Sequence, residues 1–404
     1  MINIRQSAAP LYLTAREAAG ELSISPATLY AYVSRGLIRS EPVGDGRARR
    51  YRADDVRAML ARRSGAAAPE AALPVLDTSV GTITEAGPVY RGVTAVALSE
   101  TATLEQAATL LWGVEDADPF GSTNLPAVDA AMAAVMAAAG DARPLARAIA
   151  ALSLAGDADP RAHSRSPAGR AAAGARAMRL LVAAVLGAQP SAEPVHRQVA
   201  GAWAPDAADA AELFRVALVL LADHELNAST WTVRSAASTG LSVYDALIAG
   251  LAALKGPRHG GAGPLAAMML ADLLDGDIAA RIRDRVALGQ PIPGFGHTIY
   301  RNGDPRADVL LAALVRAGAD PRLAIDAPAL ITEATGLYPT IDFALAILMR
   351  MFDLPIGHEM SLFAIARSAG WVGHAIEQLE SGVLIRPRAR YVGPQPGRGD
   401  IGGA

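Results

Sequence analysis

The chain has 404 residues, enough for two or three domains with a sizeable buried core, and 51% of them are hydrophobic. Because alanine carries much of that share while aromatic residues are scarce, we expect a mainly α-helical protein. The formal charge of −3 gives no general argument for nucleic acid or a membrane surface, and the lack of cysteine excludes thiol catalysis and disulfides.

The first residues lack the apolar core of a signal peptide, and the alanine-rich stretch from Ala130 is interrupted before it reaches membrane-spanning length. We therefore expect a cytoplasmic protein without membrane partners. The single lysine, Lys255, is followed by Gly-Pro, so the phosphate-binding Walker loop is absent and simple nucleotide hydrolysis is disfavoured.

Residues 1–63 predict a winged helix-turn-helix domain. Capping residues favour one helix over 14–22 and a second over 25–35, with glycine at 36 to end it. A turn at 44–46 followed by "RARRYR" predicts a two-stranded wing, and a third helix is expected from Asp54. The pattern resembles the MerR and excisionase type of domain.

This front segment is basic, since residues 1–65 hold eleven arginines and six acidic residues. A DNA-binding role would place the second helix in the major groove and the wing arginines on phosphates. The residues that this role would use are Thr28, Tyr30, Arg35, Arg47, Arg49, Arg50 and Arg52. The alternatives, a module for protein contacts or a vestigial fusion, stay open.

Residues 64–74 have the composition of a linker, and a second unit is expected over 75–393, followed by a Gly- and Pro-rich flexible tail over 394–404. Apolar runs separated by Gly, Pro and Asp recur through this unit and predict the helices of a bundle.

Four stretches of this unit place titratable residues at helix ends, where side chains can meet in a cleft. His224 in "ADHELNAST" ends an apolar helix; it lacks the second histidine of a zinc motif, so no metal site is predicted, and helix capping is the alternative. His259 in "LKGPRHGGAG" lies on a glycine-rich loop that admits a ligand or simply faces solvent. "PGFGHTIYRNGDPRAD" carries His297 and Arg306, with a surface turn as the alternative. Asp342 lies near a helix start, where N-capping is the alternative explanation.

Two further arginines complete a series, Arg367 in "FAIARSAGWVGHAIEQ" and Arg386 in "LIRPRARYVG". Read in order from "DTSVGTITEAGPVYRG", these stretches resemble the citrate synthase family over about 320 residues, 75–393. The resemblance implies a large helical domain with a smaller one, about 261–354, inserted in it and closing over the substrates. It also implies a homodimer in which Arg386 reaches into the neighbouring subunit.

The family joins a short acyl-CoA, usually acetyl-CoA, to oxaloacetate and hydrolyses the thioester to give citrate and CoA. Removing a proton beside a thioester carbonyl needs a base and a donor for the enolate oxygen, which the resemblance assigns to Asp342 and His259. It makes His297 the donor to the second developing oxyanion. It implies that oxaloacetate is bound by His224, Arg306, Arg367 and Arg386, and CoA by Gly294, Phe295 and Gly296. Acyl-CoA is then a co-substrate, and no permanently bound cofactor is expected.

The sequence departs from the family pattern at Thr340, usually asparagine, at Thr298, often arginine, and at Gly263-Pro264, commonly Asn-Glu. These departures bear on acyl-chain preference, CoA affinity and rate. Two other functions stay open: a 2-methylcitrate synthase that uses propionyl-CoA, and a DNA-binding regulator whose synthase-like domain is a ligand sensor.

Overall fold

The computed structural model describes residues 12–22, 24–43, 49–53, 55–56, 59, 76–114, 116–274, 276–389 and 392. The chain divides into two compact units, Met1–Asp77 and Thr78–Ala404, which are described separately. The predicted linker, the flexible tail, the turn at 44–46 and Arg47 lie outside the described residues, as does most of the predicted third helix. None of the helices in the described part of the chain has the length and apolarity needed to cross a membrane.

The first unit contains the predicted helix pair and wing. Thr14 caps α1 in a capping box, because its hydroxyl accepts from the Glu17 N–H at 3.3 Å while the Glu17 carboxylate accepts from the Thr14 N–H at 2.8 Å. Ser25 caps α2 by accepting from the Thr28 N–H at 3.2 Å. The elements are β1 (Tyr12–Thr14), α1 (Ala15–Glu21), α2 (Pro26–Ser34), β2 (Ser40–Pro42) and β3 (Arg49–Arg52).

The antiparallel sheet of this unit has the order β1-β3-β2, so the wing strands β2 and β3 pair as predicted, and β1 is an additional strand. Three residues are too few to show the alternation of a strand, which is why the sequence did not reveal β1. Leu22, Leu29, Ile38 and Tyr51 form the centre of a small separate core.

The second unit is mainly helical, as predicted. Its one described sheet has the antiparallel order β4-β5-β6, from β4 (Gly81–Thr84), β5 (Gly87–Tyr90) and β6 (Val93–Thr94). The first helices are α4 (Ala95–Leu98), α5 (Leu104–Trp112), α6 (Ala130–Ala138), α7 (Pro144–Ala158), α8 (Pro167–Leu186), α9 (Val195–Trp203), α10 (Ala210–Leu221), α11 (Ala228–Ala237) and α12 (Val243–Leu254). They are followed by α13 (Ala262–Leu274), α14 (Ile278–Ala287), α15 (Pro305–Arg316), the π-helix η1 (Arg322–Asp326), α16 (Ala327–Thr335), α17 (Ile341–Met351) and α18 (His358–Ser381).

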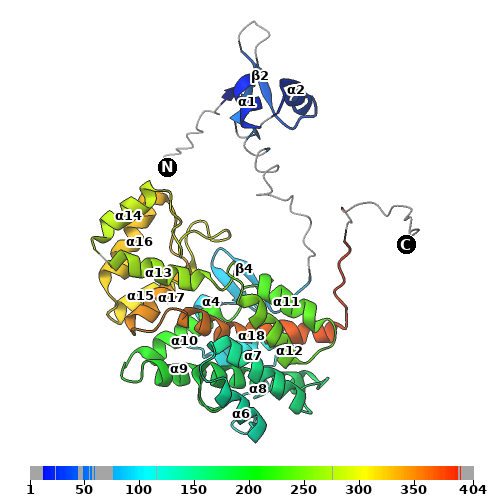
Figure 1. The fold of residues 1–404 in the computed structure, drawn as a ribbon. Helices are drawn as coiled ribbons and strands as arrows, with labels where there is room; N and C mark the ends of the chain where they lie inside the picture. Colours follow the sequence, from blue (N-terminus) through cyan, green and yellow to red (C-terminus); the bar gives the residue numbers. More distant parts are fainter. Residues whose placement is uncertain are drawn as a thin grey trace, which may run out of the picture. The chain divides into compact units, whose positions relative to one another are not determined.

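Helix α18 runs through the middle of this unit and packs against α5, α8, α10, α11 and α12 (Figure 1). Glycine permits these close contacts. A Cβ on Gly174 of α8 would lie 2.5 Å from Val372, and one on Gly250 of α12 would lie 2.8 Å from Trp371. Both distances are shorter than real Cβ contacts, so the helices can approach α18 this closely only without those side chains.

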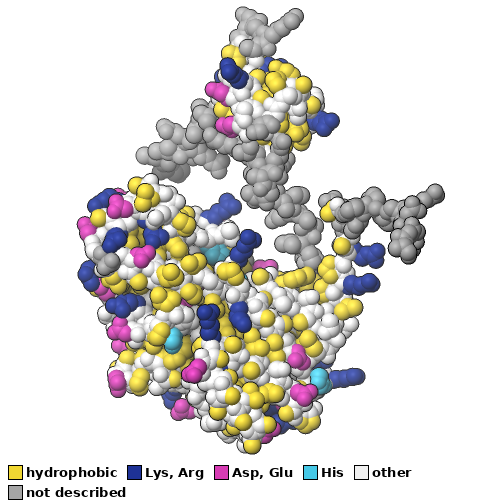
Figure 2. Space-filling model, viewed as in Figure 1, with side chains coloured by type: hydrophobic (Ala, Val, Ile, Leu, Met, Phe, Trp, Pro, Cys, Tyr) yellow, Lys and Arg dark blue, Asp and Glu magenta, His cyan; other side chains and the backbone are white. Residues whose placement is uncertain are grey.

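Helices α13 to α17 form a second group that packs mostly within itself, with α13 and α15 against α17 and α14 against α16 (Figure 1). Side chains of both charges are interspersed with apolar ones over the face of the unit in view (Figure 2). The predicted site residues belong to both helix groups, so the site must lie where the groups meet.

Candidate active site

One cleft of about 370 Å³ gathers most of the predicted site residues. Its walls come from the α10–α11 turn, the α12–α13 loop, the segment before α15, the start of α17, and α18. The lining includes His224, Asn227, His259, Gly294, Phe295, Gly296, His297, Arg306, Asp342, Phe363 and Arg367. Every predicted catalytic and substrate-binding residue except Arg386 is therefore in one place.

His224 lies in the turn that follows α10. It does not cap that helix; its Nε2 instead bonds the Tyr300 hydroxyl at 3.0 Å. The turn is held by Asp223, whose carboxylate accepts from the N–H of Glu225 at 3.1 Å, where the backbone is left-handed at φ 52°. Burial and the nearby charge of Arg306 lower the pKa of His224, so the ring is neutral.

His259 is fixed by Ser229, the second residue of α11. Its Nε2 lies 2.7 Å from the Ser229 hydroxyl, which accepts from the Trp371 indole N–H at 3.2 Å and donates to the side-chain oxygen of Asn227 at 2.9 Å. If the hydroxyl turned its proton from Asn227 to Nε2 of His259, the neutral ring would carry its own proton on Nδ1. Burial, with a smaller contribution from Arg367, lowers the pKa of His259 to about 4, which keeps the ring neutral.

The backbone determines the tautomer of His297. Its Nδ1 accepts from the N–H of Ile299 at 3.1 Å and from the N–H of Tyr300 at 3.4 Å, so the proton of the neutral ring is on Nε2. Burial and then the charge of Arg306 lower the pKa of this histidine too. His297 is thus a neutral donor, with its ring centroid 4.8 Å from that of Tyr300 and 5.7 Å from that of His224.

Asp342 is the second residue of α17 and is half-buried. Thr340 occupies the N-cap position, without a side-chain capping bond, so the N-cap alternative for Asp342 does not hold. Burial raises the pKa of its carboxyl, while the charge of Arg306 opposes that rise. A carboxyl with a raised pKa is suited to accept and release protons near neutral pH.

Arg306 is 3% exposed and is oriented by Asp304 through two hydrogen bonds, of 2.9 Å from Nε and 2.8 Å from Nη2. The same carboxylate accepts from the N–H of Ile341 at 3.0 Å. Asp304 therefore connects the arginine to the start of α17, one residue before Asp342.

Arg367 enters the cleft from α18 and is 1% exposed. Its Nε donates to the carbonyl of Leu221 at 2.9 Å, its guanidinium lies 4.5 Å from the centre of the Phe363 ring, and its buried Nη1 has no hydrogen-bond partner among the described residues. Burial lowers its pKa to about 10, so it stays charged. A buried donor without a partner is costly, and an anionic ligand in the cleft would satisfy it.

The predicted CoA-binding turn is pinned to the strand-like segment before α17. The carbonyl of Gly294 accepts from the backbone and hydroxyl of Thr340 at 2.8 and 3.1 Å, and the N–H of Gly296 donates to Tyr338 at 2.9 Å. Gly294 has φ +82°, and a Cβ there would lie 3.0 Å from Phe343, so glycine is required. The Gly294 carbonyl and the Gly296 N–H of this turn are therefore already hydrogen-bonded within the protein.

Arg386 does not line the cleft. It is exposed in the extended segment that follows α18.

In the first unit, Tyr30 and Arg35 are exposed, while the Thr28 hydroxyl bonds Ser25 at 2.9 Å. Among the wing arginines, Arg50 pairs with Glu41 at 3.0 Å, and Arg49 donates to the Ser40 hydroxyl at 2.9 Å. Arg52, also on the wing strand β3, is half-buried.

Sequence reasoning missed several residues that hold the site together. Tyr300 and Asp304 stand within the stretch quoted for His297 and Arg306, but nothing in the stretch shows which of its polar residues face the cleft. Ser229 contacts His259 across 30 residues of sequence, and Phe363 contacts Arg367 across four. Only the spacing of Phe363 and Arg367, one helical turn, could have been found in advance.

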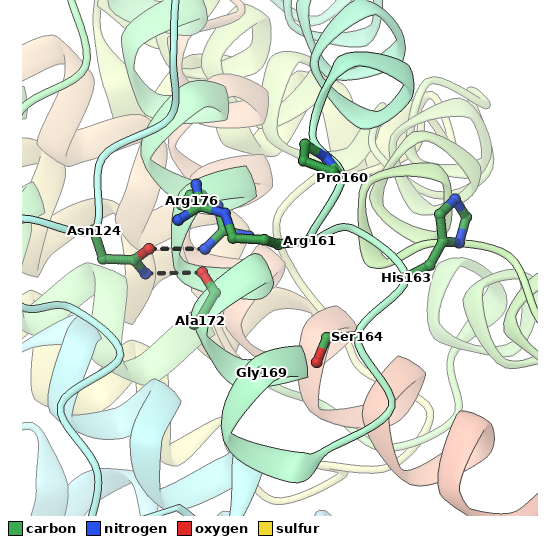
Figure 3. Close-up of a pocket in the computed structure, with 8 residues that line it drawn as sticks. All are labelled: Asn124, Pro160, Arg161, His163, Ser164, Gly169, Ala172 and Arg176. Carbon is green, nitrogen blue, oxygen red and sulfur yellow. Dashed lines mark hydrogen bonds between the residues drawn. The ribbon is translucent and has the colours of Figure 1, made fainter.

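A larger hollow of about 490 Å³ lies at the start of α8 and contains none of the predicted site residues (Figure 3). Its arginines, Arg161 and Arg176, both pair with Asp159, at 3.3 and 2.7 Å, and Arg176 also donates to Asn124 at 2.8 Å. Their charge is therefore met within the protein. No group of three or more His, Asp or Glu arranged to hold a metal is found among the described residues.

Solved structures of other proteins share this fold. A solved citrate synthase from Thermoplasma acidophilum, in a ternary complex with carboxymethyl coenzyme A and oxaloacetate, has the same fold, with a TM-score of 0.67 and 23% identity over 80% of this chain and 95% of that one. The fold is thus that of a citrate-synthase-like protein. The family model of the citrate synthase C-terminal domain matches residues 71–388, and a helix-turn-helix model matches residues 12–64. The chain belongs to the citrate synthase family.

Curated relatives include a citrate synthase of Haloferax volcanii, 39% identical over 191 residues, which cover 45% of this chain and 50% of that protein. They also include 2-methylcitrate synthase 1 of Corynebacterium glutamicum, 34% identical over 198 residues, 46% of this chain and 51% of that protein. The matched part of the chain spans about half the length of these relatives.

Proposed function

We propose that this protein condenses acetyl-CoA with oxaloacetate and water to give citrate and CoA. The observation that carries the proposal is the meeting of three neutral histidines, one carboxyl with a raised pKa and two buried arginines in a single cleft. The family and the ternary complex of the Thermoplasma acidophilum enzyme support it.

The first step removes a proton from the acetyl carbon. The Asp342 carboxylate is the base. With the Ser229 hydroxyl turned to donate to Nε2 of His259 in place of Asn227, Nδ1 carries the ring proton and donates a hydrogen bond to the thioester oxygen as the enolate forms. Because the pKa of His259 is about 4, the ring is neutral at pH 7. It therefore stabilises the enolate by a hydrogen bond and does not transfer a proton to it.

The second step attacks the ketone of oxaloacetate. His297 is suited to stabilise the developing alkoxide, because its Nδ1 is occupied by backbone N–H groups and its Nε2 proton is free to donate. Arg306 and Arg367 bind the two carboxylates by charge-assisted hydrogen bonds, with the unpartnered Nη1 of Arg367 as one donor. Hydrolysis of the resulting thioester releases citrate and CoA.

We further propose that residues 261–354, which include α13 to α17, form the smaller lobe that closes over the substrates. His224, His259 and Arg367 come from outside this lobe, and His297, Arg306 and Asp342 from within it, so closure would complete the site and exclude water. In a homodimer, exposed Arg386 would contribute to the partner's site. The alternative use of propionyl-CoA, giving 2-methylcitrate, is supported by the 2-methylcitrate synthase among the relatives.

The test is steady-state release of free CoA thiol by the purified full chain with oxaloacetate, for acetyl-CoA and propionyl-CoA separately. Turnover with acetyl-CoA and a higher kcat/KM than with propionyl-CoA is expected. A higher kcat/KM with propionyl-CoA would make the protein a 2-methylcitrate synthase. No turnover with either, while oxaloacetate binds, would favour the ligand-sensor function.

The first unit supports a second function, DNA binding. Its helix-turn-helix family match and the exposed Tyr30 and Arg35 on and after α2 favour this, although Arg50 is paired with Glu41. Affinity of the full chain for duplex DNA should fall steeply with salt, and Arg35→Ala should weaken it at every salt concentration. Affinity that is independent of salt and of Arg35 would exclude this role.

A further inference from the structure

Glu359 is a buried carboxyl that the proposed mechanism does not use. It lies in the first turn of α18, is 2% exposed, and accepts a hydrogen bond of 2.7 Å from the N–H of Gly357. Burial raises its pKa. The bond to Gly357 explains why an acidic residue suits the start of this helix, but an exposed glutamate could make the same bond. Its burial needs a second explanation.

The surroundings of Glu359 provide one. A small cavity of about 20 Å³, room for one water-sized group, adjoins the cleft and shares His259, Asp342 and Phe363 with it. Glu359 forms another wall of this cavity, together with Gly263 and Met360. The carboxyl therefore lies beside the base and the enolate donor.

Gly263 and Glu359 occupy neighbouring space. A Cβ on Gly263 would lie 2.8 Å from the Glu359 Cβ and 3.9 Å from the Asp342 Oδ1. Any larger residue at 263, including the asparagine that is common in the family, would collide with Glu359 as it stands here. The glycine is thus what allows a glutamate at 359 to fill the space next to Asp342.

This space is where the acyl group of the substrate must extend. Asp342 removes a proton from the carbon next to the thioester carbonyl and His259 donates to the carbonyl oxygen, so that carbon lies between the two side chains. A substituent on it, such as the extra methyl of propionyl-CoA, has to enter the adjoining cavity and meet Glu359.

We propose that Glu359, with Gly263, determines acyl-group specificity by limiting this cavity to a water-sized space, too small for the extra methyl of propionyl-CoA. The inference rests on the proposed condensation activity and goes beyond it by assigning the residues that select the substrate. One methylene in a closed pocket typically changes kcat/KM by about 10- to 200-fold.

The test compares kcat/KM for acetyl-CoA and propionyl-CoA in the full chain and its variants. Glu359→Ala should move the ratio toward propionyl-CoA by about tenfold or more, and Glu359→Asp, which keeps a carboxyl at the helix start, should move it less in the same direction. Glu359→Gln, with the same size, should keep the original ratio. Glu380→Ala, at the exposed end of α18, is the matched control and should change nothing.

A second experiment tests whether Glu359 acts through the space that its side chain fills or through its charge. Gly263→Ala should lower the thermal midpoint and both kcat/KM values, and Glu359→Ala in the same chain should restore part of each loss, since the two residues share one space. The proposal is overturned if Glu359→Ala and Glu359→Asp keep the original ratio, if Glu359→Gln shifts it as much as Glu359→Ala, or if the two positions act additively.

Failure of the proposed function would be seen separately, as absence of turnover by the unmodified chain. In that case the ratio of the affinities for acetyl-CoA and propionyl-CoA, measured by calorimetry with oxaloacetate present, takes the place of the kcat/KM ratio. A shift of about tenfold in Glu359→Ala would still support the inference, and an unchanged ratio would overturn it.

Discussion

Replacing Asp304 with asparagine should damage both stability and oxaloacetate use. This carboxylate is 1% exposed and accepts from three N–H groups of Arg306, at 3.1, 2.9 and 2.8 Å, and from the N–H of Ile341 at 3.0 Å. Asparagine keeps one acceptor oxygen but turns an NH₂ group toward these donors. Removing one partner of a buried ion pair costs about 3–5 kcal/mol.

The loss should appear at the oxaloacetate site, because Arg306 would no longer be oriented and its charge would be uncompensated. If about 3 kcal/mol of this cost is lost from transition-state stabilisation at the oxaloacetate site, kcat/KM for oxaloacetate falls by about 100-fold. The assay is CoA release at saturating acetyl-CoA with oxaloacetate varied, together with thermal unfolding of the same samples.

The chain provides a matched control. The sequence Asp-Pro-Arg recurs at Asp320 to Arg322, where Asp320 makes the same local bonds to Arg322 at the surface, with side chains 34% and 68% exposed. Asp320→Asn should leave unfolding and kinetics close to those of the unmodified protein, since exposed ion pairs contribute little. Equal effects of the two substitutions would refute the argument that Asp304 acts through its buried position.

The remaining predictions concern the proton-transfer groups. Asp342→Asn should lower kcat by about 1000-fold while calorimetry shows oxaloacetate binding retained; normal turnover would remove Asp342 from its role. Ser229→Ala should cost about 1 kcal/mol of transition-state stabilisation, roughly fivefold in kcat, with the KM for oxaloacetate unchanged. Because burial lowers the pKa of His259 from 6.5 to about 4, the unfolded chain binds its proton first, so stability should fall as the pH drops from 6.5 toward 4; in His259→Gln, unfolding midpoints should show a smaller fall over that range.

The fold was largely predictable because its signals are local. The caps at Thr14 and Ser25 and the turn glycine at 36 mark the two helices of the first unit within one residue of their observed ends. The apolar runs likewise marked the helices of the second unit. The three-residue strand β1 was missed, because its pairing with β3 is a tertiary contact that leaves no periodic pattern in the sequence.

For the site, the sequence predicted the residue types and their order along the chain, but not their arrangement in space. The sequence placed His224, His259, Arg306 and Asp342 at helix ends, but each had a simpler alternative there, and only the fold shows that four elements bring them together. The partners that orient them come from distant turns, as Tyr300 does for His224 across 76 residues. The role of Glu359 also depends on Gly263, 96 positions earlier in the chain, through a contact that no spacing rule predicts.

The close packing around α18 limits how this protein can diverge. At Gly370, Trp371 and Val372 the helix has almost no freedom to change, since a methyl group on Gly370 would meet Asp223 at 2.4 Å and one on Gly174 or Gly250 would meet Val372 or Trp371. Descendants of this sequence must therefore keep that part of the helix nearly unchanged. Adaptation to a new substrate is left to the first turn of α18 and to the helices that face it.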